Sequence, residues 1–423
     1  MLDIKFIREN KEIIKEGARK KQIIVDIDAL IKLDDTRREL NMAIDQKRSE
    51  QNTFNDHITK VTDESERKML IEKMKYLKDA LQKDEEKMKA VMLKWKAMML
   101  EVPNIPDMSV PEGVDESSNE TALEWGNKPE FSFKPKDHVD LMVNLKMVDF
   151  ERGAKAHGFR GYYLSGDGAE LSWALWNYGR DFFGKKNFTP FIPPVIVRKE
   201  FFYGTGHLPR ESEDLYKTGD DDYLSGTAEV PMMAYHSGEV LNENDLPRRY
   251  LAFSPCFRRE AGSYGKDTKG LLRVHEFFKL EQLIISKADH ADSVELHEEI
   301  NRNYEEFIES LGLPYRRLVI CGGDLGASKV KQYDTEAWFP AQGVYRELSS
   351  ASYYHDFQTR RFNIRYDSGG KKRYAYSLNS TAVATPRIIG AIVENFQTED
   401  GSVNIPEALR KYMGGREIIV DTA

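Results

Sequence analysis

Two long heptad patterns near the N-terminus place the strongest constraint on the fold of this chain. Steps of three and four residues through 30–58 meet an apolar side chain at six of nine positions, and a second series through 70–98 does so at eight of nine. Two heptad helices of similar length, separated by the polar stretch 59–66, predict an antiparallel helical hairpin. One hairpin cannot bury both helices on every side. We therefore expect a projecting arm over about residues 28–100, with helices roughly 40 Å long.

The rest of the chain has a different residue pattern. A proline-rich stretch at 102–111 stops the second helix, so we place an N-terminal domain at 1–105 and a second domain at 106–423. Aromatic and β-branched runs broken by glycine then predict an antiparallel sheet, and hence an α+β fold. A short amphipathic helix is expected to end near Gly17. Further helices are expected at 137–156, 169–183, 289–311 and 384–396.

Composition excludes several functional classes. The net charge of −8 argues against indiscriminate binding of nucleic acid, although basic residues gathered on one face would still allow a structured RNA ligand. The two cysteines, Cys256 and Cys321, lie far apart, so we expect neither a disulfide framework nor a zinc site. No apolar run of about 18 residues and no signal-peptide pattern occurs. We therefore expect no membrane contact and a cytoplasmic location.

The usual nucleotide-binding loops are missing. A P-loop needs the spacing G-x-x-x-x-G-K-[ST], which the glycine-rich stretch 322–329 lacks. The stretch 204–206 lacks the third glycine of a dinucleotide-binding loop. If the chain binds ATP, it must hold the nucleotide in another way.

The segment 257–281 carries most of the polar chemistry. Two strands are expected to flank a glycine- and lysine-bearing loop at 263–270. Alternation across these strands predicts that one face carries Arg258, Glu260, Arg273, His275, Phe277, Lys279 and Glu281. A guanidinium suits phosphate or carboxylate oxygens, an aromatic ring suits stacking on a purine, and a carboxylate can accept from an exocyclic amine. A solvated hairpin with ordinary cross-strand ion pairs explains the same pattern equally well.

A second polar segment lies at 379–395, where a strand is expected to run into a helix. Arg387 falls in the first turn of that helix, where an anion could also use the helix N-terminus. A simple ion pair between Arg387 and a nearby acid carries equal weight on the sequence alone.

These segments resemble the motifs of class II aminoacyl-tRNA synthetases. The pattern 257–277 is similar to motif 2, the stretch 379–395 to motif 3, and the helix from Ala169 with the stretch 188–194 to motif 1, which forms the dimer in that class. The helical hairpin and several short stretches resemble the seryl-tRNA synthetase family in particular. These stretches are 226–229, 261–271, Gly323-Asp324-x-Gly326, Glu347-Leu348-Ser349-Ser350 and Tyr412-Met413-Gly414-Gly415. The resemblance covers essentially the whole chain, and its separate motifs occur in the order of the family.

The resemblance implies an enzyme that activates L-serine with ATP and transfers it to tRNA(Ser), with tRNA(Sec) as a second candidate substrate. The implied serine-binding residues are Thr227, Ala228, Glu229, Arg258, Glu281, Asn379 and Thr381. The implied ATP-binding residues are Arg258, Arg259, Glu260, Arg273, Val274, Phe277, Glu347, Leu348, Ser349, Ser350 and Arg387. Glu347 and Ser350 are implied ligands of Mg²⁺.

The implied catalytic residues are Arg258, Glu281 and Arg387. Arg258 would bridge the serine carboxylate and the α-phosphate, where charge builds up. Phe277 and Arg387 would enclose the adenine ring, and Glu260 would face its amine. No side chain needs to act as a nucleophile, because the substrate carboxylate itself attacks phosphorus.

The resemblance also implies a homodimer in which the arm brings tRNA to the partner subunit. On composition alone the arm surface is better read as solvated, because its basic residues are interspersed with nearly as many acids. The resemblance instead implies contacts to the tRNA backbone. The candidate tRNA-binding residues are Arg37, Arg38, Lys47 and Arg48 on the arm and Lys266 and Lys269 in the motif 2 loop.

Three positions depart from the family pattern. Ala351 and Tyr353 stand where the family usually has cysteine and asparagine, and Ser380 stands where it usually has glycine. A serine at a glycine position restricts the backbone unless φ stays negative. The departures put the details of the metal site and of the pocket floor in question.

Two other functions would fit parts of this pattern. A ligase that loads an amino acid onto a carrier protein resembles the same core, but such proteins lack the arm and bind the amino acid through zinc. A catalytically inactive RNA-binding relative would have no need to retain Arg258, Glu260, Glu281, Glu347 and Arg387 together.

Overall fold

The computed structural model describes residues 1–261 and 269–421. Contacts between residues divide the chain into two compact units. One contains residues 2–19 and 23–103, and the other contains residue 1, residues 20–22 and residues 104–423. Among the described residues, no helix is both long enough and apolar enough to cross a membrane.

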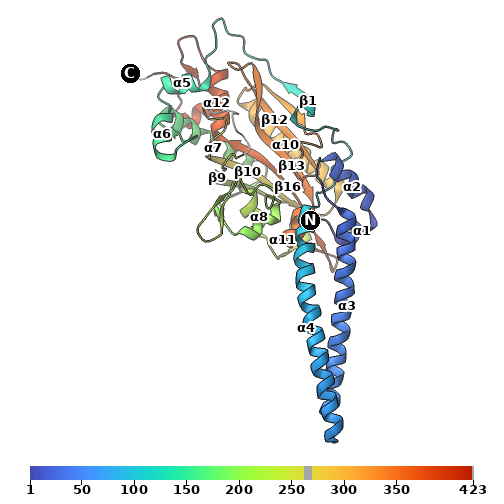
Figure 1. Cartoon of the computed structure of the whole chain (residues 1–423). Helices are drawn as coiled ribbons and strands as arrows, with labels where there is room; N and C mark the ends of the chain where they lie inside the picture. Colours follow the sequence, from blue (N-terminus) through green and yellow to red (C-terminus); the bar gives the residue numbers. More distant parts are fainter. Residues whose placement is uncertain (262–268, 422–423) are drawn as a thin grey trace. The chain divides into compact units, whose positions relative to one another are not determined.

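The first unit is dominated by a long helical hairpin (Figure 1). Helix α3 (Ile27–Ile58) and helix α4 (Glu64–Glu101) run antiparallel and pack along their length. Each begins at an aspartate that accepts hydrogen bonds from the first turn, Asp26 in α3 and Asp63 in α4, as N-caps do. The heptads account for this pairing because they line up one apolar seam on each helix. The predicted hairpin is confirmed.

The segment before the hairpin differs from the prediction of one short helix. It forms two helices, α1 (Ile4–Glu9) and α2 (Lys11–Lys20). The break falls at Asn10, whose side chain and backbone N–H both donate to the carbonyl of Phe6. Asparagine competes in this way with the helical hydrogen bonds, so it ends α1 early.

An eight-stranded sheet organises the second unit. Its strand order is β1-β11-β12-β13-β16-β10-β9-β4, and every neighbouring pair is antiparallel except β4 with β9. The strands are β1 (Glu120–Trp125), β4 (Thr189–Phe191), β9 (Arg248–Phe257), β10 (Glu276–Ser286), β11 (Tyr315–Val319), β12 (Lys331–Phe339), β13 (Val344–His355) and β16 (Tyr376–Ala384). The predicted antiparallel α+β core is confirmed.

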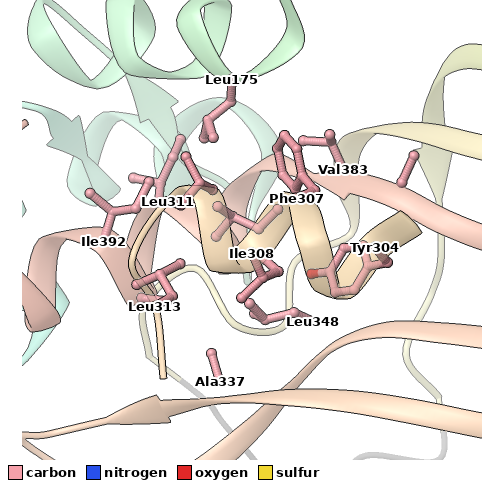
Figure 2. Packing of buried hydrophobic residues seen from close by; sticks show 14 of the residues in the cluster. Leu175, Tyr304, Phe307, Ile308, Leu311, Leu313, Ala337, Leu348, Val383 and Ile392 are labelled. Atoms are coloured by element: carbon pink, nitrogen blue, oxygen red, sulfur yellow. The ribbon is translucent and has the colours of Figure 1, made fainter. Parts of the chain in front are cut away.

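Three helices pack on this sheet and form its main core. They are α7 (Asp167–Gly184), α10 (His290–Ser310) and α12 (Thr385–Asn395), each within two residues of a predicted helix. Figure 2 shows side chains of α10, α7 and α12 meeting side chains of the strands, among them Tyr304, Phe307, Ile308, Leu175, Ile392, Ala337, Leu348 and Val383. Burial of these side chains fixes the helices on one face of the sheet.

The helix predicted at 137–156 is wrong. The structure has α5 (His138–Asn144) and α6 (Phe150–His157), with β2 (Val148–Asp149) between them paired to β3 (Tyr163–Leu164). Lys146 has a φ of 55°, which a helix cannot accommodate. Asp149 then caps α6 by accepting from the N–H of Arg152.

Smaller elements complete the unit. The helices are α8 (Lys199–Thr205), α9 (Glu229–Tyr235), α11 (Phe357–Phe362) and α13 (Glu407–Arg410), with 3₁₀ turns at Glu116–Ser118, Glu243–Asp245 and Lys411–Met413. The strands are β5 (Ile196–Val197), β6 (Tyr216–Lys217), β7 (Tyr223–Leu224), β8 (Val240–Asn242), β14 (Arg365–Ser368), β15 (Lys371–Tyr374), β17 (Val403–Asn404) and β18 (Ile418–Ile419).

Candidate active site

Two adjoining cavities lie over the central strands of the large sheet. The larger has a volume of about 700 Å³ and is lined, among others, by Thr227, Glu229, Arg258, Lys279, Glu281, Asp334, Glu347, Ser350, Tyr354, Asn379 and Thr381. The smaller, of about 60 Å³, is lined by Arg258, Glu260, Leu271, Leu272, Arg273, Val274, Phe277, Lys279, Glu347, Leu348, Thr381, Ala384, Pro386 and Arg387. Arg258, Lys279, Glu347 and Thr381 line both cavities and therefore mark their junction.

Irregular strand pairing decides which side chains reach the cavities. Along β10, which pairs regularly with β9, Phe277, Lys279 and Glu281 alternate and all line a cavity. In β13 the register with β12 shifts at Leu348, so Glu347 and Ser350 face the same cavity although they are three residues apart. Such bulges re-aim side chains, and they are common beside active sites.

The strand prediction for motif 2 is too long. Strand β9 ends at Phe257 and β10 begins at Glu276. Arg258 is held at the edge by one more backbone bond, from its N–H to the carbonyl of His275 over 2.9 Å. Glu260 has a φ of 54°, so the chain turns there and Glu260, Arg273 and His275 lie outside the strands.

The floor of the larger cavity holds two buried carboxylates. Oε1 of Glu229 accepts a hydrogen bond of 2.6 Å from the side chain of Gln358. Oε2 of Glu281 forms a close ion pair with the ammonium group of Lys279. Burial raises the pKa of Glu281, with a contribution from the charge of Glu229, while Lys279 opposes the rise. An added cation near Glu281 would therefore be favoured.

The junction is built around Arg258. Its Nε donates to the carbonyl of Gly226 over 3.2 Å, and its guanidinium carbon lies 5.4 Å from the centroid of the Phe277 ring. A Cβ at Gly226 would meet the Arg258 side chain and the Phe257 carbonyl at 3.2 Å. Glycine at 226 thus permits this close approach. The remaining guanidinium nitrogens can address an anion in the cavity.

Two ion pairs line the smaller cavity. Arg273 donates to Oε2 of Glu260 over 2.7 Å. Arg387 lies 3.2 Å from a carboxylate oxygen of Glu347 and also donates to the Glu347 carbonyl over 2.8 Å. The simple ion pair considered for Arg387 is therefore present, but its partner is itself a cavity residue.

A second carboxylate lies close to Glu347. Burial raises the pKa of Asp334 to about 7, and the negative charge of Glu347 adds to the rise. For Glu347, burial opposes ionisation, but the charges of Arg387 and Arg258 outweigh it and lower its pKa. Asp334 and Ser350 are cross-strand neighbours, so two carboxylates and a hydroxyl gather at this end of the cavity.

Some expected site residues do not face the cavities. Ala228 is buried in a hydrophobic cluster, and Ser349 donates from its hydroxyl to the carbonyl of Thr381 over 2.9 Å. Arg259 is exposed, and its N–H donates to the carbonyl of Asp214 over 2.9 Å. Neither cavity, as lined by the described residues, includes these three side chains.

The arm cations chosen from the sequence are engaged within the arm. Arg37 and Arg38 pair with Asp34, Lys47 pairs with Asp84, and Arg48 pairs with Glu85. In the motif 2 loop, Lys269 is exposed, whereas Lys266 lies outside the described residues.

The departures from the family pattern lie away from the cavity side chains. Ser380 is buried within β16 and pairs in register with Gln282 and Ala351, so its backbone is extended and does not require glycine. The carbonyl of Ala351 accepts from His297 of α10 over 2.9 Å, and the Tyr353 ring is tilted by 60° against the same histidine ring at 5.1 Å. Because neighbouring residues of a strand point to opposite faces, these two face α10.

Four residues of the site have no role predicted from the sequence. Lys279, on the expected strand face, Asp334 and Tyr354 line the larger cavity, whereas Gln358 lines neither cavity but contacts Glu229. Tyr354 donates to Oδ1 of Asn379 over 3.0 Å, and Gln358 contacts Glu229, so both act on assigned residues. Alternation along a polar strand could have indicated Asp334. Nothing local indicates Gln358.

Comparison with known proteins agrees with this geometry. Residues 1–106 match the seryl-tRNA synthetase N-terminal domain, and residues 214–396 match the class II tRNA synthetase core domain (G, H, P, S and T). The chain is 41% identical over 421 residues to a serine–tRNA ligase of Deinococcus radiodurans and 42% identical over 421 residues to one of Thermodesulfovibrio yellowstonii, with at least 98% of each chain covered.

Solved structures give the same result. The crystal structure of seryl-tRNA synthetase from Pyrococcus horikoshii complexed with ATP is similar with a TM-score of 0.90 and 39% identity, covering 100% of both chains. Cytoplasmic serine–tRNA ligase from Naegleria fowleri in complex with AMP has a TM-score of 0.87 at 35% identity, covering 100% of this chain and 99% of that one. The chain therefore belongs to the seryl-tRNA synthetase family of class II aminoacyl-tRNA synthetases.

Proposed function

We propose that this chain activates L-serine with ATP to form seryl-adenylate and then transfers serine to the 3′ end of tRNA(Ser). The observation that carries the proposal is the junction of the two cavities at Arg258. One cavity offers buried carboxylates to an ammonium group, and the other offers an aromatic ring and Arg387 to a purine. A guanidinium between them can align two anionic reactants.

The larger cavity supplies the serine site. Glu229 and Glu281 take the substrate ammonium, and Thr227, Asn379 and Thr381 address the small side chain. Burial of both carboxylates supports this assignment, because a buried carboxylate gains from a charged donor. Ala228 contributes through its backbone at the start of α9.

The smaller cavity supplies the adenine site. Phe277 and Arg387 enclose the ring, while Glu260, fixed by Arg273, accepts from the exocyclic amine. Arg258 bridges the serine carboxylate and the α-phosphate. Val274 and Leu348 also line this site, whereas Arg259 and Ser349 lie outside both cavities.

Glu347 and Ser350, together with Asp334, would hold Mg²⁺ while ATP is bound. The described residues contain no group of three histidine, cysteine or carboxylate side chains placed to hold a metal ion. Two carboxylates and a hydroxyl still suit Mg²⁺, which commonly takes one or two carboxylates and completes its shell with water and phosphate oxygens. The raised pKa of Asp334 fits this role, because a cation would relieve its repulsion with Glu347. Bound Mg²⁺ supplies neutralisation of phosphate charge.

The arm binds the tRNA, and the protein acts in the cytoplasm as a homodimer in which each arm serves the partner subunit. Exposed aromatic surface supports the dimer. Trp173 on α7 is 53% exposed and borders a cavity of about 440 Å³ with Tyr163, Trp176 and Phe278. Apolar surface of this kind, on the helix that resembles motif 1, marks an interaction site. Lys266 and Lys269 remain candidate contacts to the acceptor stem.

Serine-dependent exchange of pyrophosphate into ATP tests the first step, and aminoacylation of tRNA(Ser) with and without its long variable arm tests the second. We expect exchange with serine, and charging that requires the variable arm. If the folded protein shows no exchange, the result would favour an inactive relative. Exchange present without charging of any tRNA would favour a carrier-protein ligase. The tRNA(Sec) proposal is tested by charging that tRNA in the same assay.

A further inference from the structure

Lys279 occupies an unusual position for a buried lysine. Its side chain is 6% exposed, and its ammonium forms an ion pair with Glu281 and donates to Oγ1 of Thr227 over 2.9 Å. Both partners belong to the proposed serine site. Lys279 also lines both cavities, so it lies where the reacting groups of serine and ATP must meet.

A structural lysine in the same unit looks different. The ammonium of Lys21 is surrounded by three backbone carbonyls, those of Gly326, Ala327 and Lys329. Three acceptors satisfy the three N–H groups of a lysine. Among the described residues, Lys279 contacts one carboxylate and one hydroxyl, both facing the cavity, which leaves a donor for a bound anion.

The charges around the junction indicate that Lys279 balances the negative charge of the cavity floor. Glu229 and Glu281 contribute two negative charges at the cavity floor, and the substrate ammonium neutralises only one of them. Without Lys279 the floor would stay negative beside the point where a carboxylate must approach a phosphate. Electrostatic repulsion of this kind is strong in a partly desolvated cavity. With Lys279 the floor is neutral, and Arg258 is left to face the two anions.

We propose that Lys279 is a second cationic catalytic residue beside Arg258, whose ammonium contacts the serine carboxylate as it attacks the α-phosphate. This inference rests on the proposed function. In the step, a carboxylate oxygen forms a bond to the α-phosphorus, and the bond from that phosphorus to the bridging oxygen breaks. The electron pair leaves with pyrophosphate. No proton moves, so Lys279 acts through its charge and remains protonated throughout.

The test uses the full-length protein with Lys279→Met, which keeps length and removes charge. Lys331→Met is the matched control, because Lys331 is a half-buried lysine on β12 that packs over Tyr333 and does not line either cavity. For K279M we expect kcat of serine-dependent pyrophosphate exchange to fall by about 10²–10³-fold, as for loss of one preorganised donor to developing charge. We expect the KM for ATP to change less than about threefold, and K331M to behave as the unsubstituted protein.

Competition by serinol separates a direct contact from an effect through Glu281. Serinol keeps the ammonium and hydroxyl groups of serine but lacks the carboxylate. If Lys279 contacts the carboxylate, K279M should weaken serine binding more than serinol inhibition. Equal weakening of both, or an unchanged kcat, would overturn the inference. Methylamine added to Lys279→Ala should restore part of the exchange; absence of any restoration in that folded variant also counts against it. Lack of exchange in the unsubstituted protein would instead refute the proposed function.

Discussion

Gln358 of α11 donates a hydrogen bond of 2.6 Å to Oε1 of Glu229, the first residue of α9, and accepts one of 2.8 Å from Ser377. The two residues are far apart in sequence, and both are buried. This bond fixes one of the two carboxylates that we assign to the substrate ammonium. Gln358 therefore positions a serine-binding residue without itself being assigned a contact to serine.

Replacement of Gln358 by leucine should weaken serine binding. A hydrogen bond to a charged group contributes about 1.5–3 kcal/mol, so we expect the KM for serine to rise by roughly 10–100-fold. The KM for ATP should stay within about twofold, because Gln358 does not line the smaller cavity. Pyrophosphate-exchange kinetics measure both. Gln342→Leu, at a site where the amide accepts from Arg346, is the matched control. An unchanged KM for serine in Q358L would remove Gln358 from this role.

Replacement of Arg258 by alanine should abolish serine activation while leaving the fold intact. Its side chain is exposed to the cavity and makes one hydrogen bond to a backbone carbonyl, so little packing is lost. We expect kcat/KM for exchange to fall by at least about 10³-fold. Circular dichroism and thermal unfolding should match those of Arg248→Ala, a control at the other end of β9. Exchange at the normal rate in R258A would contradict the assigned bridge.

Serine affinity should depend on pH through Glu281. Its pKa is raised by burial, so the carboxylate takes up a proton at a higher pH than an ordinary glutamate does. The protonated form cannot pair with an ammonium group, so the KM for serine should rise as the pH falls through this raised pKa. Glu281→Gln should show a high KM that no longer changes in that range. The measurement is the KM for serine across mildly acidic pH, and a flat profile in the unsubstituted protein would refute the coupling.

Binding of Mg²⁺ with ATP should release protons through Asp334. With a pKa of about 7, this carboxyl is partly protonated at neutral pH, and a bound cation favours its ionised form. Calorimetry at pH 7 in buffers of different ionisation enthalpy should detect the release, and Asp334→Asn should remove most of it. Because the folded-state pKa lies above the unfolded value, the contribution of this group to stability declines as the pH rises from about 4 to 7. Equal proton release in D334N would contradict the assignment.

We expect three lysines of α4 to contact tRNA more readily than the arm cations predicted from the sequence. Among the described residues, Lys73, Lys75 and Lys78 form no ion pair, whereas Lys47 and Arg48 pair with acids of the facing helix. Replacing the three lysines by glutamine should raise the KM for tRNA and flatten its dependence on salt, because fewer counterions are released. Serine-dependent exchange should not change. Arg48→Gln is the comparison, with a smaller expected effect. A larger rise in the KM for tRNA in Arg48→Gln than in the triple variant, measured by aminoacylation, would instead favour the arm cations predicted from the sequence.

Much of this protein could be predicted from local sequence. The heptads defined the hairpin because each helix presents one apolar seam whatever the rest of the chain does. Simple alternation put Phe277, Lys279 and Glu281 on one face, because β10 pairs regularly with β9. The motif resemblance gave the family and its activity, which the comparisons confirm. Residue roles within the site stay predictions.

Other features depend on contacts between distant segments. The helix predicted at 137–156 fails because the intervening strand Val148–Asp149 pairs with Tyr163–Leu164, a contact that helical periodicity does not report. The shift of register at Leu348 likewise exists only between β13 and its neighbour, and it decides that Glu347 faces the cavity.

The sequence by itself determined the hairpin, the antiparallel core and the chemical character of the strand that carries Lys279 and Glu281, because these follow from side-chain periods of seven and two residues. Only the tertiary structure decided that Gln358 meets Glu229, that Asp334 faces Glu347, and that Lys279 sits at the junction of two cavities. Such pairings depend on strand register and helix packing across the whole sheet, and no local pattern encodes them.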